Sequence, residues 1–157
     1  MDHAENETSL DTPATTPVLQ IAVFLQNRAG SLLSIMELLK QNHVVVLGMS
    51  VQDSTDAAVV RFIVSDPETV IHLFMEKGIP FTRTELIVVE LNEGATQIPD
   101  CFRTILNAET NIHFVYPLLS RPNGKSALAL CVEDNDFGSA VLTKSGYKIL
   151  GQEDISR

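Results

Sequence analysis

Residues 18–27 read VLQIAVFLQN and residues 83–92 read RTELIVVELN, so one apolar run that ends in asparagine occurs twice in the chain. Each run is followed by helix-spaced apolar residues, two β-branched runs and a second helical pattern. Self-similarity over a unit of this length indicates an internal repeat. The sequence therefore predicts two copies of one small fold.

The first copy contains apolar patterns that are typical of strands and others that are typical of helices. Alternation with a period of two, as in Ile21, Val23 and Leu25, is typical of a strand, whereas apolar residues three and four apart are typical of a helix face. Asp66-Pro67 favours a helix start and Gly78 a helix end. The expected elements are a strand over 18–26, a helix that contains 32–39, strands over 44–51 and 57–64, a helix from 67 to 77 and a strand from 81.

The offset between the copies is 65 for the first strand, 66 for the first helix, 67 for the second strand and 68 for the third strand and second helix. The segment 81–91 has to supply the last strand of one copy and the first strand of the next, so we expect a bend near 83–85. A unit of about 65 residues is marginally stable alone, so the copies are expected to cover each other. The predicted domains are an acidic, disordered tail over 1–17, a first unit over 18–84 and a second unit over 85–157.

The composition narrows the function. With 20 acidic and 11 basic residues the net charge is −9, which disfavours binding to nucleic acid. No apolar run reaches the ~20 residues of a membrane span and the N-terminus lacks a signal-peptide pattern, so we expect no membrane contact and a cytoplasmic protein. Two cysteines and four scattered histidines match no zinc or disulfide pattern. No catalytic constellation is found, so we predict no metal, no cofactor and no enzymatic activity.

The corner after the first strand carries a family resemblance. The strand 21–25, followed by Gln26 and the run Asn27-Arg28-Ala29-Gly30-Ser31-Leu32, resembles the opening of an ACT domain. The resemblance extends from residue 18 to about residue 150. It implies an α+β fold of two ferredoxin-like βαββαβ units, with antiparallel sheets and helices on one face. It also implies a non-enzymatic regulatory protein or sensor whose small-molecule partner is a free amino acid.

The same corner has the chemistry of a ligand site. Gly30 lacks a Cβ and lets a ligand approach the backbone, and the free N–H groups near Ser31 suit a carboxylate. The Asn27 amide can donate to and accept from the same ligand. In the family, ligands lie against this loop at the seam between two ACT units. The alternative is that Gly30 only makes a tight turn that Asn27 caps. The resemblance implies the ligand-binding residues Asn27, Arg28, Ala29, Gly30, Ser31 and Leu32, joined by Met49, Ser50 and Val51 at the end of the second strand.

The second copy departs from this pattern. Its corner reads Asn92-Glu93-Gly94, which places Glu93 at the position of Arg28, and Pro99 falls in the first helical turns. A carboxylate there repels an anionic head group, so we expect one competent site per chain. Cys101 and Cys131 align with apolar residues of the first copy and are expected to be core residues.

A second class of function stays open. Regulatory subunits of amino-acid biosynthetic enzymes, such as the small subunit of acetolactate synthase, have similar length and a related Asn-x-x-Gly loop. In that family, however, the second half is not a plain repeat of the first. Under this hypothesis a biosynthetic enzyme is the partner. Under either hypothesis, sheet edges left open by the pair of units predict a homodimer.

Overall fold

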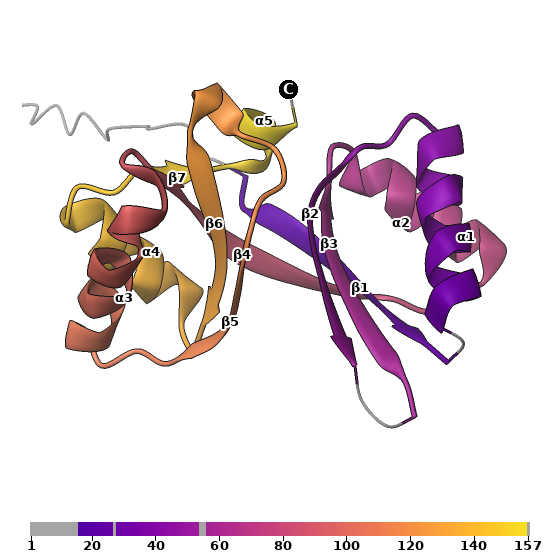
Figure 1. Cartoon of the computed structure of the whole chain (residues 1–157), viewed down its shortest axis with the longest axis horizontal. Coiled ribbons are helices and arrows are strands. Elements are labelled where there is room, and N and C mark those ends of the chain that lie inside the picture. The colour runs from indigo at the N-terminus through magenta and orange to yellow at the C-terminus, as the bar shows by residue number, and fades with distance from the viewer. Residues whose placement is uncertain (1–15, 27, 54–55, 157) are drawn as a thin grey trace, which may run out of the picture.

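The computed structural model describes residues 16–26, 28–53 and 56–156, and the predicted tail therefore lies outside the described residues as far as residue 15. Every expected strand and helix is present, with ends that differ from the prediction by a few residues (Figure 1). The elements are β1 (Val18–Leu25), α1 (Arg28–Gln41), β2 (Val46–Asp53), β3 (Ala58–Val64), α2 (Pro67–Lys77), β4 (Thr82–Leu91), η1 (Gly94–Gln97), α3 (Ile98–Asn107), β5 (Ile112–Pro117), η2 (Pro122–Gly124), β6 (Ser126–Val132), α4 (Asn135–Lys144), β7 (Ile149–Leu150) and α5 (Gln152–Ile155).

The two units have the same strand order. In the first unit the antiparallel order is β2-β3-β1-β4, and in the second it is β5-β6-β4-β7. In each unit the third strand therefore lies between the second and the first, and the fourth strand lies at the other side of the first. This is the order of a ferredoxin-like βαββαβ fold, so the predicted fold class and the duplication are confirmed.

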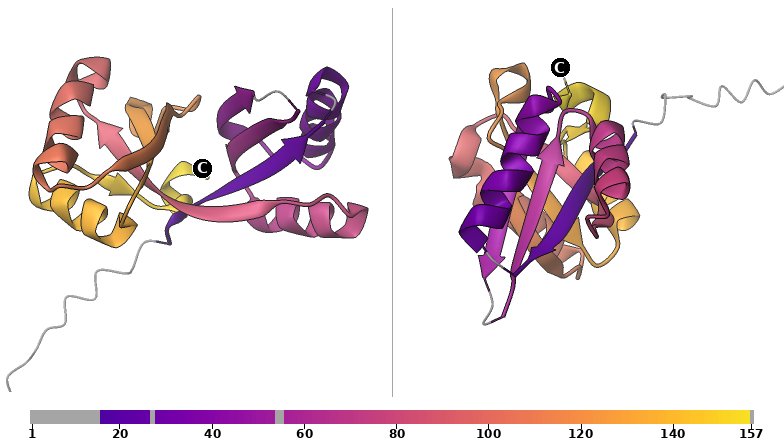
Figure 2. Two further views of the ribbon diagram at one scale, coloured as in Figure 1. Left: turned by 90° about the horizontal axis from the view of Figure 1, so that it is seen from below. Right: turned by 90° about the vertical axis from the view of Figure 1, so that its right-hand side faces the viewer.

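Strand β4 belongs to both units. Its residues Thr82–Leu86 pair with β1, and its residues Ile87–Leu91 pair with β6. Figure 2 shows β4 as one long strand that passes from one unit into the other. The strand is unbroken through 83–85, and its partner changes from β1 to β6 between Leu86 and Ile87. No break is needed, because β1 and β6 use opposite edges of the same strand.

The strand pairing corrects two of the four offsets by one position. Val23 pairs with Val60 in the first unit, and Val89 pairs with Leu128 in the second. With the third strands at the expected offset of 68, this pairing places the first strands at an offset of 66 rather than 65, and equivalent residues then face the helices in both units. The first strand of each unit carries apolar residues on both of its faces. An alignment of the two sequences therefore could not detect a shift by one position, although such a shift exchanges the two faces of the strand.

The second strands show the same correction. Val46 pairs with Val64 and Ile112 pairs with Val132, so the offset between β2 and β5 is 66 rather than 67. The offset is therefore 66 from the first strand to the second and 68 from the third strand onward. It changes once, in the hairpin that joins the second and third strands of each unit. Such hairpin loops are where insertions are tolerated.

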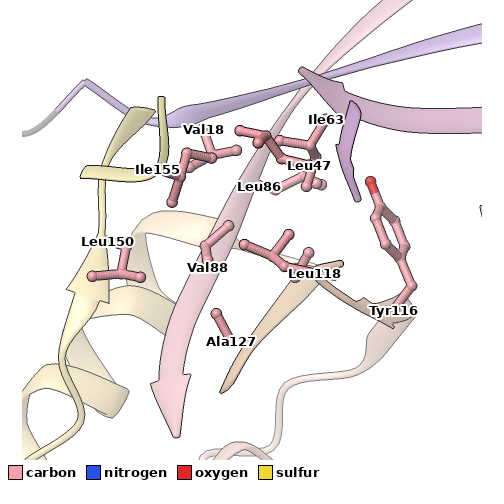
Figure 3. Packing of buried hydrophobic residues seen from close by; sticks show 11 residues of the cluster. Val18, Leu47, Ile63, Leu86, Val88, Tyr116, Leu118, Ala127, Leu150 and Ile155 are labelled. Carbon is pink, nitrogen blue, oxygen red and sulfur yellow. The ribbon is translucent and has the colours of Figure 1, made fainter. Parts of the chain in front are cut away.

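The described residues form three apolar cores. One lies between the first sheet and α1 and α2, and another between the second sheet and α3 and α4. The helix-free faces of the two sheets turn toward each other and enclose the third, which we call the seam core (Figures 1 and 3). Its residues are Val18, Leu47, Ile63, Leu86, Val88, Tyr116, Leu118, Ala127, Ala129, Leu150 and Ile155.

The outer strands of the two units also meet across the seam. A register shift between Val46 and Gly48 marks a bulge in β2, and Gly48 forms an isolated bridge with Leu118. A Cβ at Gly48 would lie 2.9 Å from Leu118 Cδ2, so glycine permits this close approach. The Leu47 carbonyl accepts hydrogen bonds from the N–H groups of Leu119 (2.7 Å) and Ser120 (3.3 Å). The second unit is thereby tied to the edge strand of the first.

Both cysteines are free thiols in apolar surroundings, as expected. Cys101 is fully buried in the core of the second unit, and Cys131 packs against the seam core. Burial raises the pKa of the Cys101 thiol from 9.0 to about 11. The thiol is therefore harder to ionise in the folded chain than in the unfolded chain.

This burial predicts a loss of stability at alkaline pH. Below pH 9.0 the thiol is protonated in both states, but between pH 9.0 and about 11 only the unfolded state releases the proton. The free energy of unfolding should fall over this window, and Cys101→Val should fall less steeply. Urea titrations at several pH values, both on a Cys131→Val background that removes the second thiol, measure the two slopes. Equal slopes would contradict the assignment.

Candidate functional site

The predicted ligand corner lies between the end of β1 and the start of α1. Asn27 lies outside the described residues, and the helix begins at Arg28, so Gly30 and Ser31 belong to its first turn. The Ser34 hydroxyl donates a hydrogen bond to the Gly30 carbonyl, 2.9 Å away. The first N–H groups of a helix have no partner within the helix.

Gly30 is not required by the local backbone or by packing. The glycines with positive φ are Gly78, Gly94, Gly124 and Gly146, and Gly30 is not among them. A Cβ at Gly30 would meet no heavy atom within 4 Å. The backbone and the packing thus give no reason for glycine here, although glycine in a helix costs about 0.5–1 kcal/mol relative to alanine. The other part of that alternative, a cap from Asn27, lies outside the described residues.

The strand part of the predicted site lies partly beside the corner. Leu32 of α1 and Met49 of β2 are both partly buried and pack against the first-unit core. Ser50 is half-buried, and Val51 is 47% exposed near the end of β2. Ala29 is exposed, and Ser31 is half-buried.

The corner is remote from the seam within this chain. None of the predicted ligand residues from Ala29 onward is in the seam core. Strand β1 begins at Val18, which is in the seam core, and runs antiparallel to β4 away from the second unit. The start of α1 therefore lies at the outer end of the first unit (Figure 1). If a seam lines this corner, it is not the one between the two units of the chain.

The second unit has a different corner. With the corrected offset of 66, Glu93 stands at the position of Asn27 and Thr96 at the position of Gly30. The chain forms the short helix η1 here before α3 begins, with Pro99 in its first turn as expected. The Thr96 hydroxyl donates to the Glu93 carbonyl (2.8 Å), so local hydrogen bonds occupy this corner.

A buried carboxylate was missed by the sequence analysis. Glu90 on β4 is 4% exposed, and its Oε1 has no hydrogen-bond partner among the described residues. Its Oε2 lies 4.0 Å from Lys125 Nζ, which donates to Asn92 Oδ1 (2.9 Å). In the sequence, Glu90 is recognisable as the single acidic residue inside the apolar run 87–91. At the offset of 66, Glu90 is equivalent to Phe24 of the first unit. The seam-facing surfaces of the two sheets therefore differ in polarity at this position.

Several hollows among the described residues lie outside the predicted corner. A hollow of about 440 Å³ lies along α3 and the start of β5, and one of about 300 Å³ lies along α1 from Ser34 onward and reaches Ile79. A third of about 180 Å³ lies between the segment 120–123 and α5. The first is lined by the single stretch 99–112, whereas the walls of the other two combine segments that are distant in sequence.

Residues 16–26, 28–53 and 56–156 contain no cluster of three or more His, Cys, Asp or Glu side chains that could hold a metal ion. None of the helices in these ranges is long and apolar enough to cross a membrane.

Known proteins resemble this chain at the level of family and fold. The family model described as "ACT domain pair" matches residues 16–157. No curated protein matches the sequence. A crystal structure of a protein from Bacteroides thetaiotaomicron is similar with a TM-score of 0.82 and 17% identity over 91% of this chain and 98% of the other. The regulatory subunit of aspartate kinase from Thermus thermophilus is similar with a TM-score of 0.57 and 13% identity, over 81% and 89%. A structure of aspartokinase alpha and beta subunits gives 0.55 and 15%, over 84% and 98%.

Proposed function

This chain belongs to the family of ACT domain pairs, and on that premise we propose that it is a non-enzymatic regulatory protein that binds a free amino acid at the β1–α1 corner. The observation that carries the proposal is Gly30. It occupies an exposed helix start where neither the backbone angle nor a neighbouring atom requires glycine. A residue that weakens its helix without a structural reason is typical of a functional position.

The charge at this helix start favours an anionic group. The first turns of α2, α3 and α4 contain Glu68, Asp100 and Asp136, whereas that of α1 contains no acidic residue. Carboxylates in a first turn compensate the partial positive charge of a helix N-terminus. In α1 this charge is left for a ligand, so the carboxylate of an amino acid is the group that fits.

A second copy of the chain is the partner that this location favours. The family resemblance implies a ligand at a seam between ACT units, and the corner lies at the outer end of the first unit. Large apolar side chains are exposed around this end, including Phe24, Leu33 and Val51. We propose that a homodimer covers this surface and completes the site. Light scattering of the full chain, with and without amino acids, measures the mass of the assembly.

Substitutions at Gly30 test the proposal. In the absence of ligand, Gly30→Ala should raise the free energy of unfolding by about 0.5–1 kcal/mol, because alanine favours the helix. In a thermal-shift screen of the common amino acids, one or a few should raise the Tm of the unaltered protein. Gly30→Val should abolish this rise, because its branched side chain fills the space that the ligand approaches.

The matched control is Thr96→Val, which places the same side chain at the equivalent position of the second unit. It should leave the ligand-induced rise in Tm unchanged. The proposal fails if every amino acid is silent at millimolar concentration, or if Gly30→Val keeps the full response.

A second candidate function is a regulatory subunit of an amino-acid biosynthetic enzyme. It is supported by the fold shared with the regulatory subunit of aspartate kinase and by the acetolactate synthase resemblance of the loop. The second half of this chain is a plain repeat of the first, whereas that of the acetolactate synthase small subunit is not. This difference argues against a subunit of the acetolactate synthase type. Co-purification of the full chain with a biosynthetic enzyme favours this candidate over a free-standing sensor.

A further inference from the structure

The third hollow lies at the joint between the two units. Its volume is about 180 Å³, the share of about six water molecules at ~30 Å³ each. One wall is the segment that follows β5, and the other is α5. The lining residues are Ser120, Arg121, Pro122, Asn123, Asp154 and Ile155.

Two opposite charges line this hollow without neutralising each other. Arg121 is exposed and Asp154 is half-buried, and no ion pair joins them in the described part of the chain. Asp154 Oδ2 accepts a hydrogen bond from the Gly151 N–H (2.8 Å), and this bond holds the carboxylate in place. A guanidinium binds a carboxylate through two parallel hydrogen bonds, and a carboxylate binds an ammonium group.

The wall also contains a polar atom without a partner. Ser120 Oγ is buried and makes no hydrogen bond to any described residue. Because almost none of this oxygen's surface is accessible, a ligand atom in the hollow does not reach it. Arg121 and Asp154 are therefore the charged side chains that a small molecule in this space can contact.

Both walls are anchored to the first unit. The Ser120 N–H donates to the Leu47 carbonyl (3.3 Å), and the Gln152 N–H donates to the Thr16 carbonyl (2.9 Å). Gln152 Nε2 also donates to the Val64 carbonyl (3.0 Å). A ligand that bridges the two walls therefore connects elements that hold the units together.

We propose that this hollow binds a small zwitterion, with the chemistry of a free amino acid the size of alanine or serine. Its carboxylate pairs with Arg121 and its ammonium group pairs with Asp154. The site is separate from the Gly30 corner, and the two can be occupied or lost independently. A bound zwitterion stabilises the joint, because it links the segment 120–123 to α5.

The experiment follows the backbone amides of the 15N-labelled full chain during titration with L-alanine. The amides of 120–123 and 153–155 should shift and saturate. Propionate and ethylamine, which carry one charge each, should shift them at least tenfold less strongly at the same concentration. Equal shifts with propionate or ethylamine would overturn the proposal, because they indicate one charge contact and not a zwitterion site.

Three variants complete the test. Arg121→Gln and Asp154→Asn should each weaken alanine binding at least tenfold, and the asparagine oxygen can still accept the Gly151 hydrogen bond. The matched control is Glu153→Gln, which removes the charge of an exposed neighbour that does not line the hollow. It should leave the affinity unchanged.

Gly30→Val separates this inference from the proposed function. It should remove shifts near the start of α1 and leave those at 120–123 intact. The proposal is overturned if alanine moves no amide around the hollow, or if Arg121→Gln and Asp154→Asn bind as tightly as the unaltered chain.

Discussion

Phe62→Ala is expected to lower the free energy of unfolding by about 3–5 kcal/mol. Phe62 is fully buried in the first-unit core, and its ring packs edge-on against Phe74 at a centroid distance of 6.1 Å. Truncation removes this contact and leaves a cavity between β3 and α2. The loss should appear as a lower midpoint in a urea titration followed by circular dichroism.

The tyrosines should report the same loss, although both lie in the other unit. The chain has two tyrosines, Tyr116 and Tyr147, and both follow the shared strand. Because β4 pairs in both sheets and the seam core joins them, we expect the units to unfold together. Tyrosine fluorescence and circular dichroism should therefore give one midpoint for Phe62→Ala.

The matched substitution is Leu130→Ala, which stands at the equivalent position of the second unit and is also fully buried. It should lower both signals together in the same way. A tyrosine transition that stays at its original midpoint in Phe62→Ala would show that the units unfold independently, and would contradict the structural role of the shared strand.

Tyr116→Phe is expected to lower the free energy of unfolding by about 1–3 kcal/mol. The Tyr116 hydroxyl donates a 2.8 Å hydrogen bond to Gln20 Oε1 across the seam. Gln20 is 2% exposed, so its amide oxygen has no water to replace the lost donor. Burial also raises the pKa of the Tyr116 phenol above its usual value, so the neutral, donating form persists.

A double-mutant cycle tests this contact. Gln20→Met with Tyr116→Phe replaces both partners with apolar side chains and should recover much of the loss, because no buried polar group is left unpaired. Tyr147→Phe, at a half-buried site away from the seam, should cost less. Additive losses in the double variant would contradict a coupled hydrogen bond.

Features with local chemistry were predictable from the sequence. Asp66 and Asp134 each accept a backbone hydrogen bond at the start of a helix, from Thr69 and Phe137 (both 3.1 Å). Hydrogen bonds from the Thr69 hydroxyl and N–H also hold the pKa of Asp66 below its usual value. A cap needs only residues three positions apart, so a short motif contains the whole interaction.

Features that depend on which face of a sheet a residue occupies were not predictable in the same way. The error of one position in the first strands arose because they are buried on both sides, where apolar letters do not alternate. The second strands each contain a register shift, which the letters do not reveal. The buried Glu90 looked like one acid among twenty, because only the covering of the sheet makes it unusual.

The two candidate sites differ in the same way in how far the sequence indicated them. Gly30 and its helix start were visible as a motif, but their position at the outer end of the first unit depends on the direction in which β1 leaves the seam. The Arg121–Asp154 hollow had no sequence signal, because its two walls come from distant parts of the chain.

The amino-acid sequence by itself determined the order of the elements, their caps and their duplication, because periodicity and capping act between residues a few positions apart. The tertiary structure alone decided that one strand serves both sheets, which faces meet at the seam, and which polar groups converge there. Those outcomes depend on pairs such as Gln20 and Tyr116, which are distant in the chain and adjacent only after folding.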